Sequence, residues 1–259
     1  MDRQEQWMEN RCGRITASEL GNLTSASGKI IDGNLSFIRQ KRWERRHGYA
    51  LPVNAKQFDI GHETEPYIYD WAVKNLPLLY PELKGVKFLY AQNLPELPFW
   101  VPSEFDKFGA SPDCFSEDES IVVEFKTLVG NDTKCFYMDE HTSYEEKKTA
   151  VFKEHGDQIL GQFLSNSKVK TIFLVKYAPQ LDDVIKDVDA PDAPWRGVVF
   201  RFDREDFVAS IRSLKDRIEL FDAFIDSDIN PSEFKVGTWS LSFPDGKLEQ
   251  TIEEKPKKK

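Results

Sequence analysis

The chain has 259 residues, of which 44 are acidic and 35 basic, giving a net charge of −9, and 40% are hydrophobic. At about 150 residues per domain this length allows one large or two small domains, and the core needs neither a disulfide nor a metal for stability. Cys12, Cys114 and Cys135 form no Cys-x-x-Cys pair, which argues against a disulfide framework or zinc site and indicates a reducing cytoplasm. The sequence shows no signal peptide and no membrane span, and its acidic balance disfavours a protein coated in nucleic acid.

Three helices are predicted in the first third of the chain. Residues 15–23 are typical of a short helix with Thr16 or Ser18 as its N-cap, because a hydroxyl there can accept the free amides of a first turn. Residues 36–47 indicate a second helix. Residues 61–75 indicate a third, with apolar side chains at helical spacing.

Short β-rich runs follow, separated by proline, glycine and acidic turn residues, which is typical of a strand meander. They cover residues 86–92, 98–105, 108–115 and 120–128. The remaining predicted elements are a helix over 152–164, strands over 170–177 and 197–203, a helix capped by Asp203 and ending near Asp226, and a hairpin over 236–248 that turns near Pro244, Asp245 and Gly246. Helices before and after a mixed central sheet make the fold class α/β or α+β. Because no repeat or linker divides the chain, we expect one domain over residues 1–259.

The meander contains the strongest candidate for chemistry. Glu124 and Lys126 end a β-branched run, so the period of two places both side chains on the same face of a buried strand. Asp113 lies eleven residues before Glu124, the separation expected for an antiparallel neighbour joined by a turn over residues 116–120. Two carboxylates and an ammonium group would then converge at one end of a hairpin.

Such a cluster permits two interpretations. Carboxylate oxygens suit Mg²⁺ or Mn²⁺, with a lysine placed to hold and polarise an attacking water. The alternative is a plain ion pair across two strands, because structural ion pairs form the same kind of cluster.

Five stretches of the sequence form an ordered set of motifs between about Trp7 and Tyr177. In order, they are Trp7 with Arg11-Cys12-Gly13-Arg14-Ile15-Thr16-Ala17-Ser18-Glu19, Val53-Asn54-Ala55-Lys56 with Gly61-His62-Glu63-Thr64-Glu65, Ser111-Pro112-Asp113, Glu124-Phe125-Lys126, and Gln158. With these motifs the sequence resembles the PD-(D/E)xK nuclease superfamily and, within it, the lambda-type phage exonuclease family, also called viral recombinase exonucleases. Cys114 and Thr127-Leu128 depart from the family pattern, which usually has Gly and Cys-Pro at these places.

The resemblance implies a restriction-endonuclease-like core and a divalent metal site. Asp113, Glu124 and the Phe125 carbonyl would bind Mg²⁺ or Mn²⁺, with two ions in the site, and Glu65 would complete the shell directly or through water. Lys126 would orient the nucleophilic water and stabilise charge on the scissile phosphate. The alternative for Glu65 is an ordinary surface position on a helix.

The resemblance also implies a pocket for a 5′-terminal phosphate. Its members would be Arg11, Ser18, Ser111 and Gln158. A guanidinium fork matches phosphate geometry, and hydroxyls supply further donors. Each residue has an ordinary alternative, such as a helix cap for Ser18 or an ion pair for Arg11.

Further DNA contacts are expected before the Glu65 helix and along residues 36–47. The resemblance makes Phe58 an apolar wedge that separates terminal base pairs, with Lys56 on the adjacent backbone. The alternative for Phe58 is a hydrophobic staple packed on the core. Residues 36–47 hold five basic side chains against one acid, and Arg39, Arg42 and Arg46 share a helical face that either follows a DNA backbone or is merely solvated.

These observations favour a metal-dependent exonuclease that degrades duplex DNA ends, most simply from 5′ to 3′, and leaves a 3′ single strand for recombination. The family implies a ring-shaped homotrimer around DNA, a single-strand annealing protein as partner, and a phage or prophage gene expressed in bacterial cytoplasm. One alternative is a site-specific or structure-specific endonuclease on the same fold. Another is a non-catalytic adaptor that binds DNA ends.

Overall fold

A five-stranded mixed sheet forms the centre of the computed structural model, which describes residues 3–22, 33–50, 56–179, 196–230, 239–242 and 247–250. The strand order is β2-β4-β5-β6-β7, with β5 and β6 parallel and the other neighbours antiparallel. The strands are β2 (Phe88–Tyr90), β4 (Cys114–Ser116), β5 (Ile121–Thr127), β6 (Thr171–Tyr177) and β7 (Gly197–Asp203). The helices are α1 (Arg3–Arg11), α2 (Gly33–His47), α3 (Lys56–Leu79), α4 (Asn131–Met138), α5 (Tyr144–Ser165) and α6 (Val208–Asp226).

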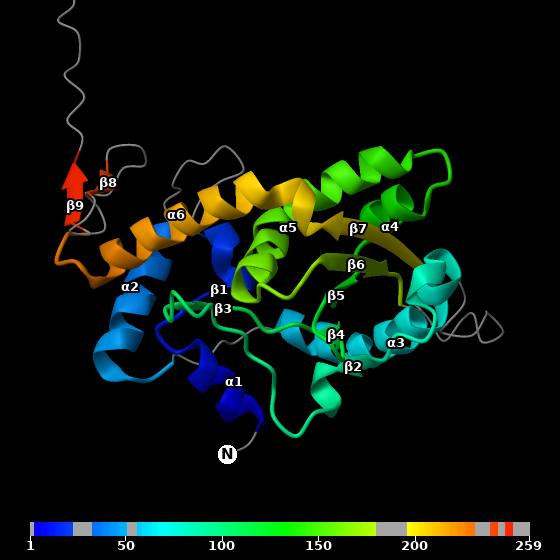
Figure 1. The fold of residues 1–259 in the computed structure, drawn as a ribbon, viewed down its shortest axis with the longest axis horizontal. Helices are drawn as coiled ribbons and strands as arrows, with labels where there is room; N and C mark the ends of the chain where they lie inside the picture. The colour runs from blue at the N-terminus through cyan, green and yellow to red at the C-terminus, as the bar shows by residue number, and fades with distance from the viewer. Residues whose placement is uncertain are drawn as a thin grey trace, which may run out of the picture.

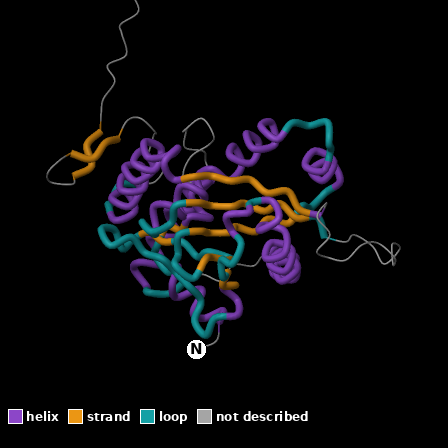
Figure 2. Tube along the Cα trace, turned by 45° about the vertical axis from the view of Figure 1, so that its right-hand side comes forward, coloured by secondary structure: helices purple, strands orange, loops and turns teal. Residues whose placement is uncertain are grey.

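Helices cover both faces of this sheet (Figure 1). α5 and α6 lie over one face, and α3 lies over the other, which the turned view in Figure 2 shows as layers. The fold class predicted from the sequence, a mixed sheet flanked by helices, is therefore confirmed. No helix in the described ranges is both long and apolar enough to cross a membrane.

The alternation of β5 decides which side chains face the candidate site. Val122 packs in the core beneath α5 and α6, whereas Val123 and Phe125 pack in the core beneath α3. Side chains two residues apart share a face of a strand. Glu124 and Lys126 therefore point toward α5 with Val122, which places two ionisable groups at the end of an otherwise apolar strand.

The N-terminal segment differs from the predicted short helix. Thr16 belongs to β1 (Ile15–Thr16), which pairs in parallel with β3 (Phe108–Gly109), and a 3-10 helix over Ala17–Asn22 follows. Thr16 directly precedes this 3-10 helix and therefore holds the predicted N-cap position, whereas Ser18 lies inside the helix. The Glu19 carboxylate accepts hydrogen bonds from the backbone nitrogen and the hydroxyl of Thr16, at 3.0 and 2.8 Å, and these bonds hold the tight turn.

Three further boundaries are corrected or confirmed. The helix predicted over 61–75 begins earlier, at Lys56, and ends later, at Leu79. Asp203 does not cap α6, because its carboxylate accepts from Thr171 of the neighbouring strand at 2.7 Å and α6 begins only at Val208, after a short 3-10 turn. The predicted terminal hairpin is present, as β8 (Trp239–Ser242) paired antiparallel with β9 (Lys247–Gln250).

Candidate active site

The hairpin of β4 and β5 brings the predicted carboxylates and lysine together. Cys114 pairs with Val123, so Asp113 lies beside the next residues of β5. The Asp113 Oδ2 atom accepts a hydrogen bond from the Phe125 backbone nitrogen at 2.8 Å. The Lys126 Nζ atom lies 2.6 Å from Oε1 of Glu124, whose side chain is only 3% exposed.

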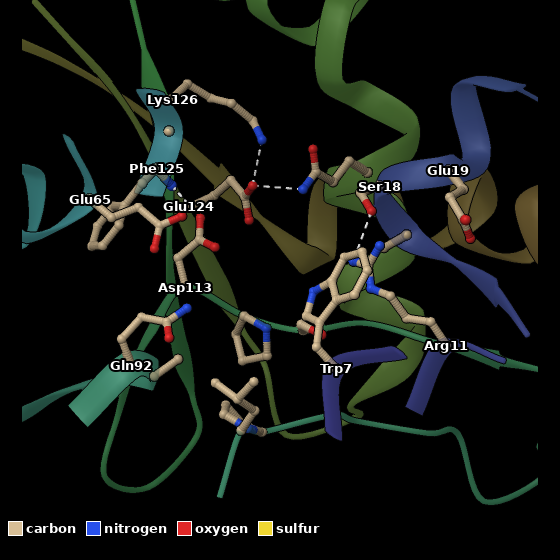
Figure 3. A pocket seen from close by; sticks show the side chains of 18 of the residues that line it. Trp7, Arg11, Ser18, Glu19, Glu65, Gln92, Asp113, Glu124, Phe125 and Lys126 are labelled. Carbon is tan, nitrogen blue, oxygen red and sulfur yellow. Dashed lines mark hydrogen bonds and ion pairs between the residues drawn. The ribbon is translucent and has the colours of Figure 1, made fainter. Parts of the chain in front are cut away.

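Glu65 reaches the same place from α3. Its Oε2 atom accepts a hydrogen bond from the Tyr90 hydroxyl at 3.4 Å, and Tyr90 lies on β2 at the edge of the sheet. Figure 3 shows Glu65, Asp113 and Glu124 pointing toward one another, with Lys126 on the far side of Glu124. Three carboxylates therefore converge, and the ammonium group of Lys126 contacts one of them, Glu124.

The electrostatics of this cluster are unbalanced. Burial raises the pKa of Asp113 well above its usual range, and the charges of Glu124 and Glu65 raise it further. Burial alone would lower the pKa of Lys126, but the neighbouring carboxylates of Glu124 and Asp113 outweigh it and raise that pKa. The cluster thus holds more negative charge than its lysine neutralises, which is the condition that a divalent cation relieves.

The donor set suits a hard cation in an open site. Among the described residues, no group of three or more His, Cys, Asp or Glu side chains is arranged so that it could hold a metal ion. Mg²⁺ does not need one, because it usually keeps several waters and is held by one or two carboxylates together with substrate phosphates. Asp113 and Glu124, with the carbonyl of Phe125, fit that kind of binding, and Glu65 would then act through water.

A guanidinium group faces the carboxylates across the cavity. Arg11 ends α1, lies over the ring of Trp7 at 4.2 Å from the ring centroid, and donates to the Ser18 hydroxyl at 3.1 Å. Burial lowers the pKa of Arg11, although the charges of Glu19, Asp113 and Glu124 oppose that shift. Its Nε atom is buried without a hydrogen-bond partner. Arg11 and Ser18 therefore form a cationic, hydroxyl-bearing corner that is suited to an anion.

Both groups of residues line one cavity of about 910 Å³. The members predicted from the sequence that line it are Arg11, Ser18, Glu65, Ser111, Asp113, Glu124, Phe125, Lys126 and Gln158. Figure 3 shows the carboxylates on one side and Trp7, Arg11 and Ser18 on the other. Gln158 lies nearer the carboxylate side than the phosphate interpretation implies, because its Nε2 atom donates to Glu124 Oε1 at 2.6 Å.

Two residues that contact the site's charged groups or line its cavity, Gln162 and Glu19, were not among the predicted site residues. Gln162, one turn after Gln158 on α5, donates from Nε2 to the other oxygen of Glu124. Its signal in the sequence was the spacing of four residues, which places both amides on the same helical face. Glu19 lines the cavity and forms an ion pair with the buried Lys41 at 3.2 Å. The ion pair between Glu19 and Lys41 forms because α2 packs beside the 3-10 helix, and no pattern in the sequence indicates it.

The position of Ser18 depends on the close approach of α5 to the 3-10 helix. A Cβ atom at Gly161 would lie 2.8 Å from Leu20 and 2.9 Å from the Ala17 side chain, closer than real Cβ contacts. Gly161 therefore lets the two elements touch, and their contact holds Ser18 over the cavity.

Gly161→Ala is expected to destabilise the protein. An alanine in a helix usually stabilises by about 1 kcal/mol relative to glycine, but overpacking here should cost about 1–3 kcal/mol. Urea unfolding measures the change. Gly156→Ala is the matched control on α5, because the nearest atoms that its Cβ would meet belong to the Phe152 ring, at 3.3 Å. Equal stability of the two variants would contradict the packing argument.

The predicted basic face of residues 36–47 is only partly available for DNA. Arg39 and Arg46 are exposed. Arg42 is not, because its guanidinium donates to the backbone oxygens of Phe224 and Ile225 at 2.7 and 3.0 Å, at the C-terminal end of α6. The expectation that Arg42 shares an exposed DNA-binding face is therefore wrong. A helical pattern shows which residues share a face but not which other helix covers it.

Lys56 and Phe58 lie in the first turns of α3, and their side chains fall outside the described part of the structure. Both interpretations of Phe58, the wedge and the staple, placed it before the helix, and the start of α3 at Lys56 corrects that position for both. The contacts expected of both residues stay predictions.

Comparisons with known proteins identify the fold. No protein-family model and no curated protein matches the chain. An alkaline exonuclease, LHK-Exo from Laribacter hongkongensis, is similar over 86% of this chain and 92% of its own, with 18% identity and a TM-score of 0.58. The same enzyme in complex with dAMP gives a TM-score of 0.56 at 18% identity, over the same shares of both chains. A phage-related exonuclease from Haemophilus somnus 129PT is similar over 82% of this chain and 93% of its own, with 14% identity and a TM-score of 0.55. The chain therefore has the fold of these exonucleases, as its resemblance to the lambda-type family predicted.

Proposed function

We propose that the protein is a metal-dependent exonuclease that degrades duplex DNA from its ends. The observation that carries this proposal is the single cavity in which the Asp113, Glu124 and Lys126 cluster faces the Arg11 and Ser18 corner. A carboxylate and lysine cluster suits hydrolysis of a phosphodiester bond. A cationic corner opposite it suits a terminal phosphate, which distinguishes a chain end from an internal position.

The structural neighbours support the same activity. Two of the similar structures are of an alkaline exonuclease and one is of a phage-related exonuclease. One of them contains dAMP, a nucleotide with a single phosphate. A cavity that binds such a molecule would serve an enzyme that releases nucleotides one at a time.

The roles of the residues follow from their positions. Asp113, Glu124 and the Phe125 carbonyl would hold Mg²⁺ or Mn²⁺, one or two ions, with Glu65 acting through water. The bound ions would supply Lewis acidity and lower the pKa of water at the scissile phosphate. The ammonium group of Lys126 lies beside Glu124. From there it can orient the attacking water and balance charge on the phosphate. Arg11, Ser18 and Ser111 would hold the 5′-phosphate, with Gln158 between the two halves.

One experiment tests the activity and its direction. Linear duplex DNA labelled at the 5′ or the 3′ end is incubated with Mg²⁺, and we expect the 5′ label to be released first. Covalently closed circular DNA should remain intact. Cutting of the circle would favour the endonuclease alternative, and binding of ends without release of either label would favour the adaptor.

The phosphate corner gives a second expected result. Duplex with a 5′-phosphate should be degraded faster than duplex with a 5′-hydroxyl, and Arg11→Ala should shrink the difference, because losing a charge-assisted contact costs about 1.5–3 kcal/mol. Initial rates on both substrates measure it. Equal rates for wild type and variant on both ends would remove the phosphate role and leave the metal site untouched.

The rest of the proposal rests on the resemblance in the sequence. We propose that the protein forms a homotrimeric ring around DNA and produces 3′ single strands for recombination with an annealing protein as partner. We also propose that a phage or prophage encodes it and that it acts in the cytoplasm of a bacterial host. Arg39 and Arg46, exposed on α2, and Lys56 and Phe58, in the first turns of α3, are the proposed contacts to the DNA duplex.

A further inference from the structure

The Glu124 carboxylate is held by three hydrogen-bond donors. Lys126 and Gln158 both lie 2.6 Å from its Oε1 atom. Gln162 donates to its Oε2 atom. The two glutamines lie one turn apart on α5, and the lysine comes from the same strand as Glu124. Both oxygens are therefore fixed from the side of the helix.

Gln162 is an unusual choice for its position. It is 1% exposed, and Ile159 and Phe163 on the same helix are also fully buried. Its Oε1 atom is buried without a hydrogen-bond partner. A buried carbonyl oxygen without a partner costs stability, and an apolar side chain of similar volume avoids that cost. The contact with Glu124 is the interaction that a glutamine provides here and an apolar residue does not.

We infer that Gln162 is a positioning residue that fixes the orientation of Glu124 before the metal binds. The inference rests on the proposed metal-dependent function. Groups that hydrogen-bond to a ligating carboxylate orient it, and their loss typically weakens metal affinity or activity by about 10- to 100-fold. Gln162 serves this purpose at Oε2, the oxygen that neither Lys126 nor Gln158 contacts.

The inference predicts a separation between stability and metal affinity. Gln162→Met keeps the volume of the side chain and removes both polar atoms. We expect Mn²⁺ and Mg²⁺ to bind about 10- to 100-fold more weakly by isothermal titration calorimetry without DNA. The melting temperature of the metal-free variant should stay close to that of wild type, because the lost hydrogen bond is offset by removal of the unpartnered oxygen.

Asn75→Leu provides the matched control. Asn75 is another buried helical amide, 2% exposed, which donates to the Trp71 backbone oxygen at 2.9 Å on α3, at the opposite face of the sheet. Its replacement should leave the metal dissociation constant unchanged. Any general effect of removing a buried amide would appear in both variants.

The outcomes are distinct. Equal metal affinity of wild type and Gln162→Met would overturn the positioning role alone. Absence of metal binding by wild type would overturn the proposed function and this inference with it. If Gln162→Met does not fold, NMR spectra of the wild-type protein test the inference through the side-chain amide resonances of Gln162. They should shift when Mg²⁺ is added while those of Asn75 do not, and unchanged Gln162 resonances would overturn the inference.

Discussion

Asp113→Asn is expected to abolish DNA cleavage and, at neutral pH, to raise the melting temperature of the metal-free protein. Cleavage should fall by roughly 10³-fold or more, the scale of losing one member of a catalytic unit. The fold should survive, because an asparagine oxygen can still accept the hydrogen bond from the Phe125 backbone nitrogen. The gain in stability follows from the removal of one of three crowded carboxylate charges.

The pH dependence of that gain has a definite sign. Burial, Glu124 and Glu65 raise the pKa of Asp113 in the folded protein above its value in the unfolded chain. The protonated group is therefore favoured by folding, and this contribution is lost as pH rises through the raised pKa. The asparagine variant should match wild type in acid, below the ordinary pKa of an aspartate, and exceed it above the raised pKa.

Thermal unfolding with EDTA or Mg²⁺ measures this prediction. In a chain of this size a change of 1 kcal/mol shifts the melting temperature by about 2–4 °C. Mg²⁺ should stabilise wild type and have little effect on Asp113→Asn, because a ligand stabilises only the state that binds it. A variant that cleaves at the normal rate, or that Mg²⁺ stabilises as much as wild type, would show that Asp113 is not a ligand.

Lys126→Met should also lose cleavage, but with the opposite effect on stability. The loss should be about 10²–10⁴-fold, the range for a group that stabilises charge or assists proton transfer. The variant should still bind metal, since Asp113 and Glu124 remain. Its metal-free form should melt below wild type, because the carboxylates lose the cation that lies 2.6 Å from Glu124.

The direction of this stability change follows from the raised pKa of Lys126. Glu124 and Asp113 raise the pKa of Lys126 in the folded protein, so its charged form contributes stability throughout the neutral range. That contribution is lost only as pH rises through the raised pKa. Calorimetric titration of Lys126→Met with metal tests whether it still binds metal, and thermal unfolding tests whether it melts below wild type. Normal cleavage, or a melting temperature above that of wild type, would contradict the assigned charge balance.

The hairpin with the candidate catalytic residues could be predicted from the sequence because it is local. Asp113 and Glu124 are joined by one tight turn, and a β-branched run fixes which face of the strand Glu124 and Lys126 share. The resemblance added the distant members, Arg11 and Glu65, which no spacing rule places beside the hairpin. The cavity contains both.

Other features depend on contacts that one segment does not encode. The face containing Arg39, Arg42 and Arg46 was evident from periodicity, but the packing of Arg42 on the end of α6 joins residues more than 180 positions apart. Asp203 precedes a helix as a cap would, yet its pairing with Thr171 across two strands takes its carboxylate elsewhere. In both cases the side chain forms hydrogen bonds with a residue that is distant in sequence, instead of the interaction that the local sequence pattern predicted.

The segment from Phe108 to Asp113 joins the two halves of the cavity within six residues. Phe108 pairs with Ile15, just after the segment that bears Arg11, and Ser111 and Asp113 both line the cavity. Changing this segment to suit another kind of DNA terminus would therefore also shift Asp113, the proposed metal ligand. Substitutions on α1 and the 3-10 helix lie outside this segment, so they are the better place to alter the proposed preference for chain ends.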